Sequence, residues 1–118
     1  MENQEITFRE ITQGNEVFRI PEIMGRLYKQ RRSKIFEGGG RINIEISCPF
    51  CGEIHTHSPS KIFDAPPGYR RSHCSLSRYR GTYYIKGTYK GEPQKNQPKG
   101  WVNVRGETVE KVWAKIGR

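Results

Sequence analysis

The sequence predicts an α+β fold, in which a small antiparallel sheet carries a zinc knuckle of zinc-ribbon or treble-clef type and about two helices pack against it. Three observations lead to this prediction. Short runs of alternating apolar residues recur along the chain, a C-x2-C motif follows the clearest of them, and the last residues have the apolar spacing of a helix. The length of 118 residues suits a single domain over residues 1–118, because two separate cores would each be small.

The N-terminal segment is expected to begin with two strands. The sequences EITFREI (residues 5–11) and EVFRI (residues 16–20) are short runs typical of strands. Between them, Gly14 and Asn15 tolerate positive φ, so the sequence favours a turn at this point.

Residues 20–32, IPEIMGRLYKQRR, are expected to form the first helix. Their apolar residues recur at helical spacing, and Pro21 suits the first helical position. Gly25 costs such a helix about 1 kcal/mol relative to alanine. The run Gly38–Gly40 predicts a flexible hinge, so residues 1–37 could form an N-terminal sub-part of the domain.

The clearest strand is RINIEIS, residues 41–47, in which three isoleucines alternate with polar residues. The segment EIHTHS, residues 53–58, could return antiparallel to it. In that case His55 and His57 would share one face, because side chains alternate with period two along a strand. Residues 63–68, FDAPPG, predict an ordered loop.

The C-terminal part is expected to contain a strand or hairpin, a loop and a helix. Residues 77–91 are rich in tyrosine and threonine, which favour a strand, and residues 92–100 form a polar loop with two prolines. Residues 107–117, ETVEKVWAKIG, predict a helix that Gly117 ends. Its apolar face would consist of Val109, Val112, Trp113 and Ile116.

The composition indicates a thin core and a basic surface. Apolar residues make up 33% of the chain, and so small a core usually needs a disulfide, a metal or a partner for stability. The formal charge of +9 points to a polyanionic partner, although a basic surface without such a partner is the alternative. With no signal sequence, no apolar run of roughly 18 residues and an odd number of cysteines, we expect a soluble cytoplasmic protein without a membrane segment.

The cysteines and histidines predict one Zn²⁺ per chain. Cys48 and Cys51 form a C-x2-C turn that delivers two thiolates to one point, and Cys74 is the natural third ligand because it is the remaining cysteine. The fourth ligand would be a histidine. We rank His57 first, then His55, then His73, because a histidine next to Cys74 on a strand would point away from the metal.

The segment from about residue 42 to residue 74 resembles a pattern found in small zinc-finger-like proteins of phages and bacterial mobile elements, C-P-x-C-G-x-x-H-x-H-G…G-H-R-x-x-H-C. Ser58 stands where that pattern has glycine, and Tyr69 where it has histidine. The resemblance implies Cys48, Cys51, Cys74 and at least one of the three histidines as metal ligands. It implies no particular activity.

A structural metal site is favoured over a catalytic one. Catalytic zinc usually has three protein ligands and an open position, whereas this chain offers four ligands. The H-x-E…P-C-x-x-C pattern of deaminases and the H-E-x-x-H pattern of metalloproteases are both absent. A zinc-dependent nuclease is the enzymatic alternative, with a histidine as base and Glu53 or Asp64 near the metal.

Two basic clusters, residues 25–34 and residues 69–90, predict a nucleic-acid-binding protein with a regulatory role. Arginine and lysine neutralise phosphates, and tyrosine can stack on an unpaired base. The candidate contacts are Arg26, Lys29, Arg31, Arg32, Lys34, Arg70, Arg71, Arg78, Tyr79, Arg80, Tyr83, Lys86 and Lys90. The alternative for the tyrosines is packing in the core. The alternative for the function is a phage-type inhibitor or adaptor that docks on a host or defence protein, and an exposed N-terminal strand could pair with a second copy.

Overall fold

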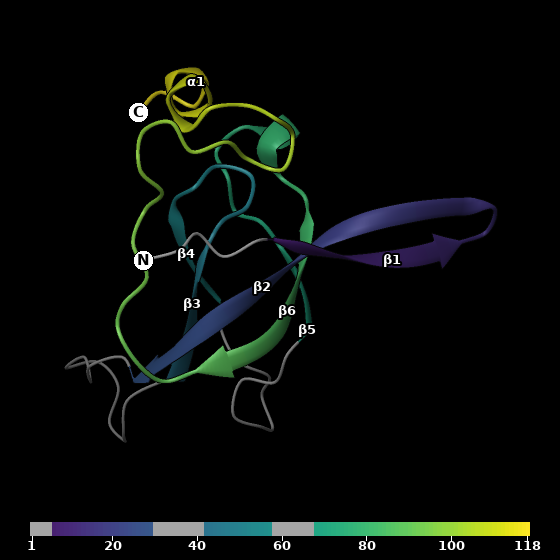
Figure 1. Cartoon of the computed structure of the whole chain (residues 1–118), viewed down its shortest axis with the longest axis horizontal. Helices are drawn as coiled ribbons and strands as arrows, with labels where there is room; N and C mark the ends of the chain where they lie inside the picture. Colours follow the sequence, from purple (N-terminus) through teal and green to yellow (C-terminus); the bar gives the residue numbers. More distant parts are fainter. Residues whose placement is uncertain (1–5, 30–41, 58–67) are drawn as a thin grey trace.

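The computed structural model describes residues 6–29, 42–57 and 68–118, and in this part of the chain it contains one mixed sheet and one α-helix (Figure 1). The strands are β1 (Thr7–Gln13), β2 (Glu16–Lys29), β3 (Ile42–Ser47), β4 (Ile54–His57), β5 (Gly68–Arg71) and β6 (Thr82–Tyr89). A 3-10 turn, η1, spans Ser77–Tyr79, and the helix α1 spans Val109–Lys115. The expected α+β character is therefore present, with one α-helix among the described residues where about two were predicted.

The long strand β2 organises the sheet, whose strand order is β4-β3-β2-β6-β5, with β1 paired to β2 outside this path. Residues 16–22 of β2 pair antiparallel with β1, and residues 26–29 pair antiparallel with β3. On β6 the pairing is parallel, from Glu22 opposite Tyr84 to Arg26 opposite Tyr89. The prediction of a wholly antiparallel sheet is therefore wrong, because β2 and β6 meet through a long connection that no local pattern reveals.

The helix predicted for residues 20–32 is wrong over residues 20–29, which belong to β2. The apolar residues of this segment do fit helical spacing, but β2 gains backbone partners on both edges, from β1 and β3 on one side and β6 on the other. Such pairing outweighs a weak helical preference that Gly25 already lowers. Residues 30–32 and the predicted hinge Gly38–Gly40 lie outside the described residues.

The two predicted N-terminal strands are confirmed, and together they form a hairpin. Gly14 occupies the turn with a φ of 62°, as the sequence anticipates. Figure 1 shows that β1 and the first half of β2 project from the rest of the sheet, and we call this two-stranded part (residues 7–21) the hairpin arm. The predicted pairing of residues 53–58 with the preceding strand is confirmed as well, since β4 runs antiparallel to β3.

The core lies between the sheet and the C-terminal helix. Its fully buried side chains are Ile44, Ile46, Cys48, Cys51, Cys74, Tyr79, Tyr83, Ile85, Val109 and Val112. The predicted apolar face of α1 is confirmed, since Val109 and Val112 are buried there. Thr108 caps the helix by accepting a hydrogen bond from the Lys111 amide, and Gly117, with a φ of 82°, follows its last turn.

The loop between β6 and α1 is held against the sheet by several hydrogen bonds. The Gln94 amide donates to Glu45 Oε1 at 2.7 Å, and the Gln94 side chain donates to the Met24 carbonyl at 3.1 Å. Further along, the Gln97 amide donates to the Gly52 carbonyl at 2.8 Å. The loop predicted for residues 92–100 is thus an ordered strap across the sheet. No helix in the described ranges has the length and apolar character that crossing a membrane requires.

Candidate metal centre

The C-x2-C segment forms a tight turn at the end of β3, as the sequence predicts. The Cys48 amide donates to the Glu53 carbonyl at 2.8 Å, and the Gly52 amide donates to the Cys48 carbonyl at 2.9 Å. Gly52 has a φ of 76°, a conformation that glycine adopts without strain. The Phe50 amide points at Cys48 Sγ at 3.4 Å, an arrangement that stabilises negative charge on the sulfur. We call residues 48–52 the knuckle.

Four side chains converge beside the knuckle: Cys48, Cys51, His55 and Cys74. Their ligand atoms all lie within 4.8 Å of one another, so the group could hold a metal ion. The Sγ atoms of Cys48 and Cys74 are 3.6 Å apart, and His55 Nε2 lies 3.2 Å from Cys51 Sγ and 3.8 Å from Cys74 Sγ. A tetrahedral zinc ion with ordinary bond lengths requires about 3.8 Å between sulfurs and about 3.6 Å between sulfur and nitrogen. The donor types and spacings therefore fit zinc.

Neighbouring groups hold the cluster from two sides. The Ser72 hydroxyl lies 2.7 Å from Cys74 Sγ and 3.4 Å from Cys48 Sγ, so it can donate a hydrogen bond to a thiolate. The Trp113 indole of α1 donates to the Cys51 carbonyl at 2.7 Å. The C-terminal helix thus fixes the backbone of the knuckle, which orients the sulfur ligands.

The electrostatics of the cluster favour a cation. Burial opposes ionisation of Cys48, but hydrogen bonds from Cys51 and the other members outweigh it and lower the pKa of its thiol. The hydrogen bond to the Cys48 sulfur raises the pKa of Cys51. Burial alone would lower the pKa of His55, yet the sulfurs of Cys48 and Cys74 raise it to about 9. Three thiolates cannot ionise together in a buried cluster unless a positive charge lies among them.

The structure brings His55 into the cluster, and His57, which the sequence ranked first, does not belong to it. The His57 ring is hydrogen-bonded to the Tyr83 hydroxyl, and its centroid lies 5.0 Å from that of His73. Burial, followed by the charges of His73 and Arg70, lowers the pKa of His57 to about 4. His57 is therefore a neutral core residue at pH 7, and His73 is exposed.

The strand register explains this choice. His55 and His57 lie two residues apart on β4, so alternation along the strand cannot distinguish them. In the register with β3, however, His55 lies opposite Ile46 and His57 lies opposite Ile44. Ile46 precedes Cys48 by two residues, so His55 is the histidine at the knuckle end of the strand pair.

Two of the predicted nucleic-acid contacts are core residues. Tyr79 and Tyr83 have no solvent exposure, and this agrees with the alternative of core packing. The Tyr79 hydroxyl donates to Glu107 Oε2 at 3.1 Å, and the Tyr83 ring packs on Phe50 and His57. A buried ring offers no face to a base, so neither tyrosine belongs among the candidate contacts.

Two of the predicted basic contacts are engaged within the protein. Arg26 on β2 forms an ion pair with Glu45 on β3 at 2.9 Å, and this pair lowers the pKa of Glu45. Arg80 donates through Nε to the Cys74 carbonyl at 2.9 Å, so it supports the segment that carries Cys74. Both side chains therefore stabilise the fold through contacts within the protein.

The other predicted basic contacts differ in exposure. Those with exposed side chains are Lys29, Arg71, Arg78, Lys86 and Lys90. Arg70 is half-buried and donates to the Tyr69 carbonyl at 3.0 Å. The predicted contacts Arg31, Arg32 and Lys34 lie outside the described residues.

Of the two acids considered for a nuclease, Glu53 is ion-paired with Arg118 at 2.7 Å, and Asp64 lies outside the described residues. The four side chains of the cluster already match the ligand number of a closed structural zinc site.

Several exposed basic residues were not among the contacts predicted from the sequence. They are Arg9, Arg19, Lys95, Lys99, Arg105, Lys111, Lys115 and Arg118. They lie outside the two compact clusters, and the signal that could have found them is the uneven distribution of charge along the whole chain.

Comparisons of the chain with protein-family models, with curated proteins and with solved structures found no match. The resemblance to phage zinc-finger-like proteins therefore stays a prediction. What can be said of function rests on the cluster and on the surface around it.

Proposed function

We propose that the chain is a zinc-stabilised nucleic-acid-binding protein with a regulatory role, in which Cys48, Cys51, His55 and Cys74 hold a structural Zn²⁺ ion. Bound zinc would supply the cross-link that a thin core lacks. The residues of the chain would then contact the polyanion from an ordered surface. No reaction is assigned to the metal, because its four ligands are all protein side chains.

The observation that carries the nucleic-acid proposal is the charge of residues 68–118. The basic residues there are Arg70, Arg71, Arg78, Arg80, Lys86, Lys90, Lys95, Lys99, Arg105, Lys111, Lys115 and Arg118, and the acidic residues are Glu92, Glu107 and Glu110. Among the described residues, the ion pairs are Arg9 with Glu22, Arg26 with Glu45 and Arg118 with Glu53, so most of these cations have no acidic partner. Phosphate groups are the common biological counter-charge for such a surface.

The strap between β6 and α1 adds a geometric argument. It carries Lys95 and Lys99, with Lys90 two residues before it, and its backbone is fixed to the sheet and to the knuckle by the hydrogen bonds of Gln94 and Gln97. Cations on an ordered loop lose less conformational freedom on binding than cations on a flexible tail. The strap is therefore the first place to test.

Fluorescence anisotropy of the zinc-loaded protein with labelled single-stranded DNA, single-stranded RNA and duplex DNA tests the proposal. Affinity should fall steeply with salt, because each phosphate contact releases a counterion. The triple variant Lys90→Gln, Lys95→Gln, Lys99→Gln should bind more weakly. It should also lower the salt slope by about two to three, at roughly one per lost contact.

Glu92→Gln is the matched control, because it lies in the same strap and changes the charge in the opposite sense. It should bind at least as tightly as the natural chain. The oligonucleotides recovered from the assay should be intact on a denaturing gel, and cleavage that a chelator abolishes would instead favour the nuclease. Absence of binding at low salt would overturn the proposal and favour the protein-docking adaptor.

A further inference from the structure

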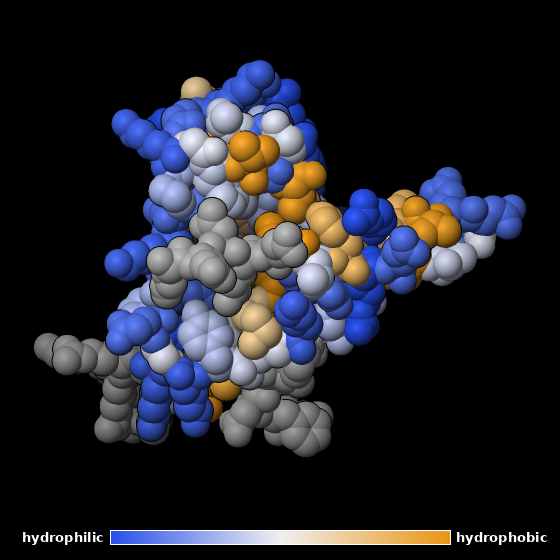
Figure 2. All heavy atoms as spheres, viewed as in Figure 1, coloured by the Kyte–Doolittle hydropathy of each residue, from blue (hydrophilic) through white to orange (hydrophobic). Residues whose placement is uncertain are grey.

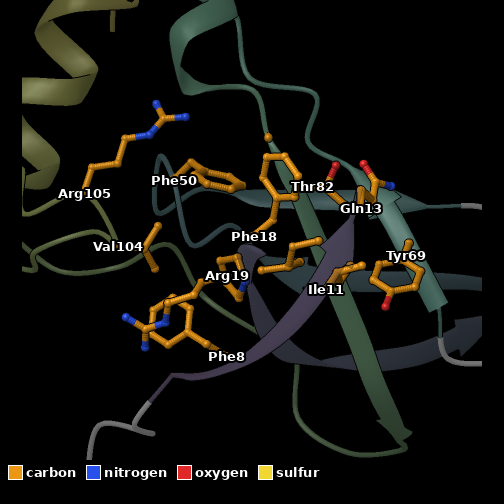
Figure 3. A pocket seen from close by; sticks show the side chains of 13 residues that line it. Phe8, Ile11, Gln13, Phe18, Arg19, Phe50, Tyr69, Thr82, Val104 and Arg105 are labelled. Atoms are coloured by element: carbon orange, nitrogen blue, oxygen red, sulfur yellow. The ribbon is translucent and has the colours of Figure 1, made fainter. Parts of the chain in front are cut away.

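A cavity of about 770 Å³ lies between the hairpin arm and the body of the protein (Figure 3). Its size falls within the range of small-molecule sites, about 300–1,000 Å³. Aromatic rings from four separate parts of the chain line it: Phe8 from β1, Phe18 from β2, Phe50 from the knuckle and Tyr69 from β5. Figure 2 shows apolar side chains along the arm and on the body beside its base.

Part of the cavity wall is held in place by the fold. A Cβ atom at Gly81 would lie 2.6 Å from the Phe50 ring, so the ring packs directly on the glycine backbone. Phe50, which is buried, also stacks with the buried Tyr83 ring, with 6.4 Å between centroids. The Tyr69 ring packs edge-on against Tyr84, with 4.7 Å between centroids. These rings are therefore positioned before any ligand arrives, which reduces the entropic cost of binding.

Two guanidinium groups lie on one side of the cavity, as Figure 3 shows. Arg19 lies over the Phe8 ring at 4.3 Å, and Arg105 lies over the Phe50 ring at 5.1 Å. Both side chains are exposed, and among the described residues none of those that line the cavity is acidic. A guanidinium that rests on a ring still presents its N–H groups outward in its own plane, where an anion can accept their hydrogen bonds.

Polar side chains lie on the side of the cavity opposite the arginines. Figure 3 shows Gln13 of the arm and Thr82 of β6 there. Their amide and hydroxyl groups can donate and accept hydrogen bonds. The cavity thus has an aromatic interior, a polar end and a cationic end.

We propose that this cavity binds one unstacked nucleobase together with its phosphate group, the base at the exposed rings of Phe18 and Tyr69 and the phosphate at Arg19, with the buried Phe50 ring as part of the wall. This inference rests on the proposed nucleic-acid function and assigns a base-binding site to it. An apolar peptide side chain would leave the two guanidinium groups without a counter-charge, and an acidic peptide would leave the aromatic walls unused. A nucleotide matches both the aromatic walls and the guanidinium groups, since bases stack on aromatic rings and phosphate pairs with arginine.

The shared chemistry is a base with a phosphate, and it could come from a free mononucleotide or from a single strand. The test uses AMP and adenosine by calorimetry, and a single-stranded DNA with one 2-aminopurine by fluorescence. AMP should bind more tightly than adenosine, and the 2-aminopurine emission should change when the base leaves its neighbours and stacks in the cavity.

Two variants separate the roles of ring and cation. Phe18→Ala should weaken both AMP and the single strand by about fivefold to a hundredfold, the usual contribution of one stacked base. Arg19→Gln should weaken AMP and leave adenosine unchanged, because adenosine has no phosphate. Phe18 is 43% exposed on the arm, so its removal should leave the thermal unfolding midpoint unchanged.

Val17→Ala is the matched control. Val17 is the neighbour of Phe18 on the arm, is 61% exposed and does not line the cavity. It should bind AMP and the single strand as the natural chain does.

The outcomes distinguish this inference from the proposed function. If the single strand binds and depends on the strap lysines, but Phe18→Ala binds it equally well, the cavity inference is overturned and the proposed function stands. If AMP binds but single-stranded DNA, single-stranded RNA and duplex DNA all fail to bind at low salt, the cavity inference stands and the proposed function fails. If neither AMP nor any of these nucleic acids binds at low salt, both are overturned.

Discussion

A chelator added to the zinc-loaded protein is expected to abolish the cooperative folded state. The cluster joins the end of β3, the start of β4 and the segment after β5, and its three thiols are fully buried. Structural zinc contributes on the order of 10 kcal/mol to small domains at neutral pH. The whole net stability of a domain is about 5–15 kcal/mol, so the core that remains should not suffice. Far-ultraviolet circular dichroism with and without chelator measures this directly.

The assignment of His55 rather than His57 as the fourth zinc ligand leads to a second prediction about zinc binding. His55→Ala should lose tight zinc binding, whereas His57→Ala should keep one zinc per chain, although it breaks the buried hydrogen bond to Tyr83 and lowers stability by about 1–3 kcal/mol. Cobalt substitution supplies the readout, because the thiolate and d–d absorption bands of bound Co²⁺ depend on the ligand set. They should change with His55→Ala and persist with His57→Ala.

Zinc addition after chelation should restore the folded signal, and acid should act like the chelator, because the thiols and His55 must be deprotonated to bind the metal. A chelated protein that retains its full circular dichroism and thermal midpoint would contradict the structural role. A His57→Ala variant that loses its zinc while His55→Ala retains it would reverse the ligand assignment.

Gly25→Ala is expected to destabilise the sheet by about 1–3 kcal/mol, the usual range for overpacking a core. A Cβ atom at Gly25 would overlap the Cγ2 methyl of Ile44 and lie 3.4 Å from that of Ile85. Both isoleucines are fully buried, so neither has room to turn away. At roughly 4 °C per kcal/mol for a chain of this size, thermal unfolding of the zinc-loaded protein should show a clear drop.

Gly91→Ala is the control for this prediction. A Cβ atom there would meet the Tyr89 ring at 3.6 Å, an ordinary contact, and Gly91 is exposed. Its stability should change by no more than about 0.5 kcal/mol. Equal midpoints for the two variants would mean that Gly25 is not enclosed by Ile44 and Ile85 as described.

Gly25 also shows why one element could not be predicted from the sequence. Within residues 20–32 it looks like a weak point of an amphipathic helix, whereas in the fold it is the place where two strands bring their isoleucines together. The difference depends on β3 and β6, which begin 13 and 53 residues after the end of β2. Helical periodicity depends only on residues that are close in the sequence. In this segment the apolar residues have helical spacing although the segment folds as a strand.

Contacts between segments that are distant in the sequence also decide which histidine joins the cluster and which tyrosines are buried. The Cys48 and Cys74 sulfurs meet across 26 residues, and His57 and Tyr83 meet across the same separation. On β6, Tyr83 and Tyr84 are adjacent, so their rings lie on opposite faces of the strand, and only the packing of β6 against the knuckle decides which ring is buried. The aromatic rings of the cavity beside the hairpin arm likewise come from four segments that share no motif.

The sequence by itself determined the parts of this protein whose cause is local. Three cysteines in the right spacing specify the chemistry of the cluster, strict alternation specifies β3, and the spacing and cap of residues 107–117 specify α1. The tertiary structure alone decided that β2 is a strand with a parallel partner, that His55 joins the thiols, and which cations and rings reach solvent. Local preferences act between neighbours in the chain, whereas burial and ligand distance are properties of segments that only folding brings together.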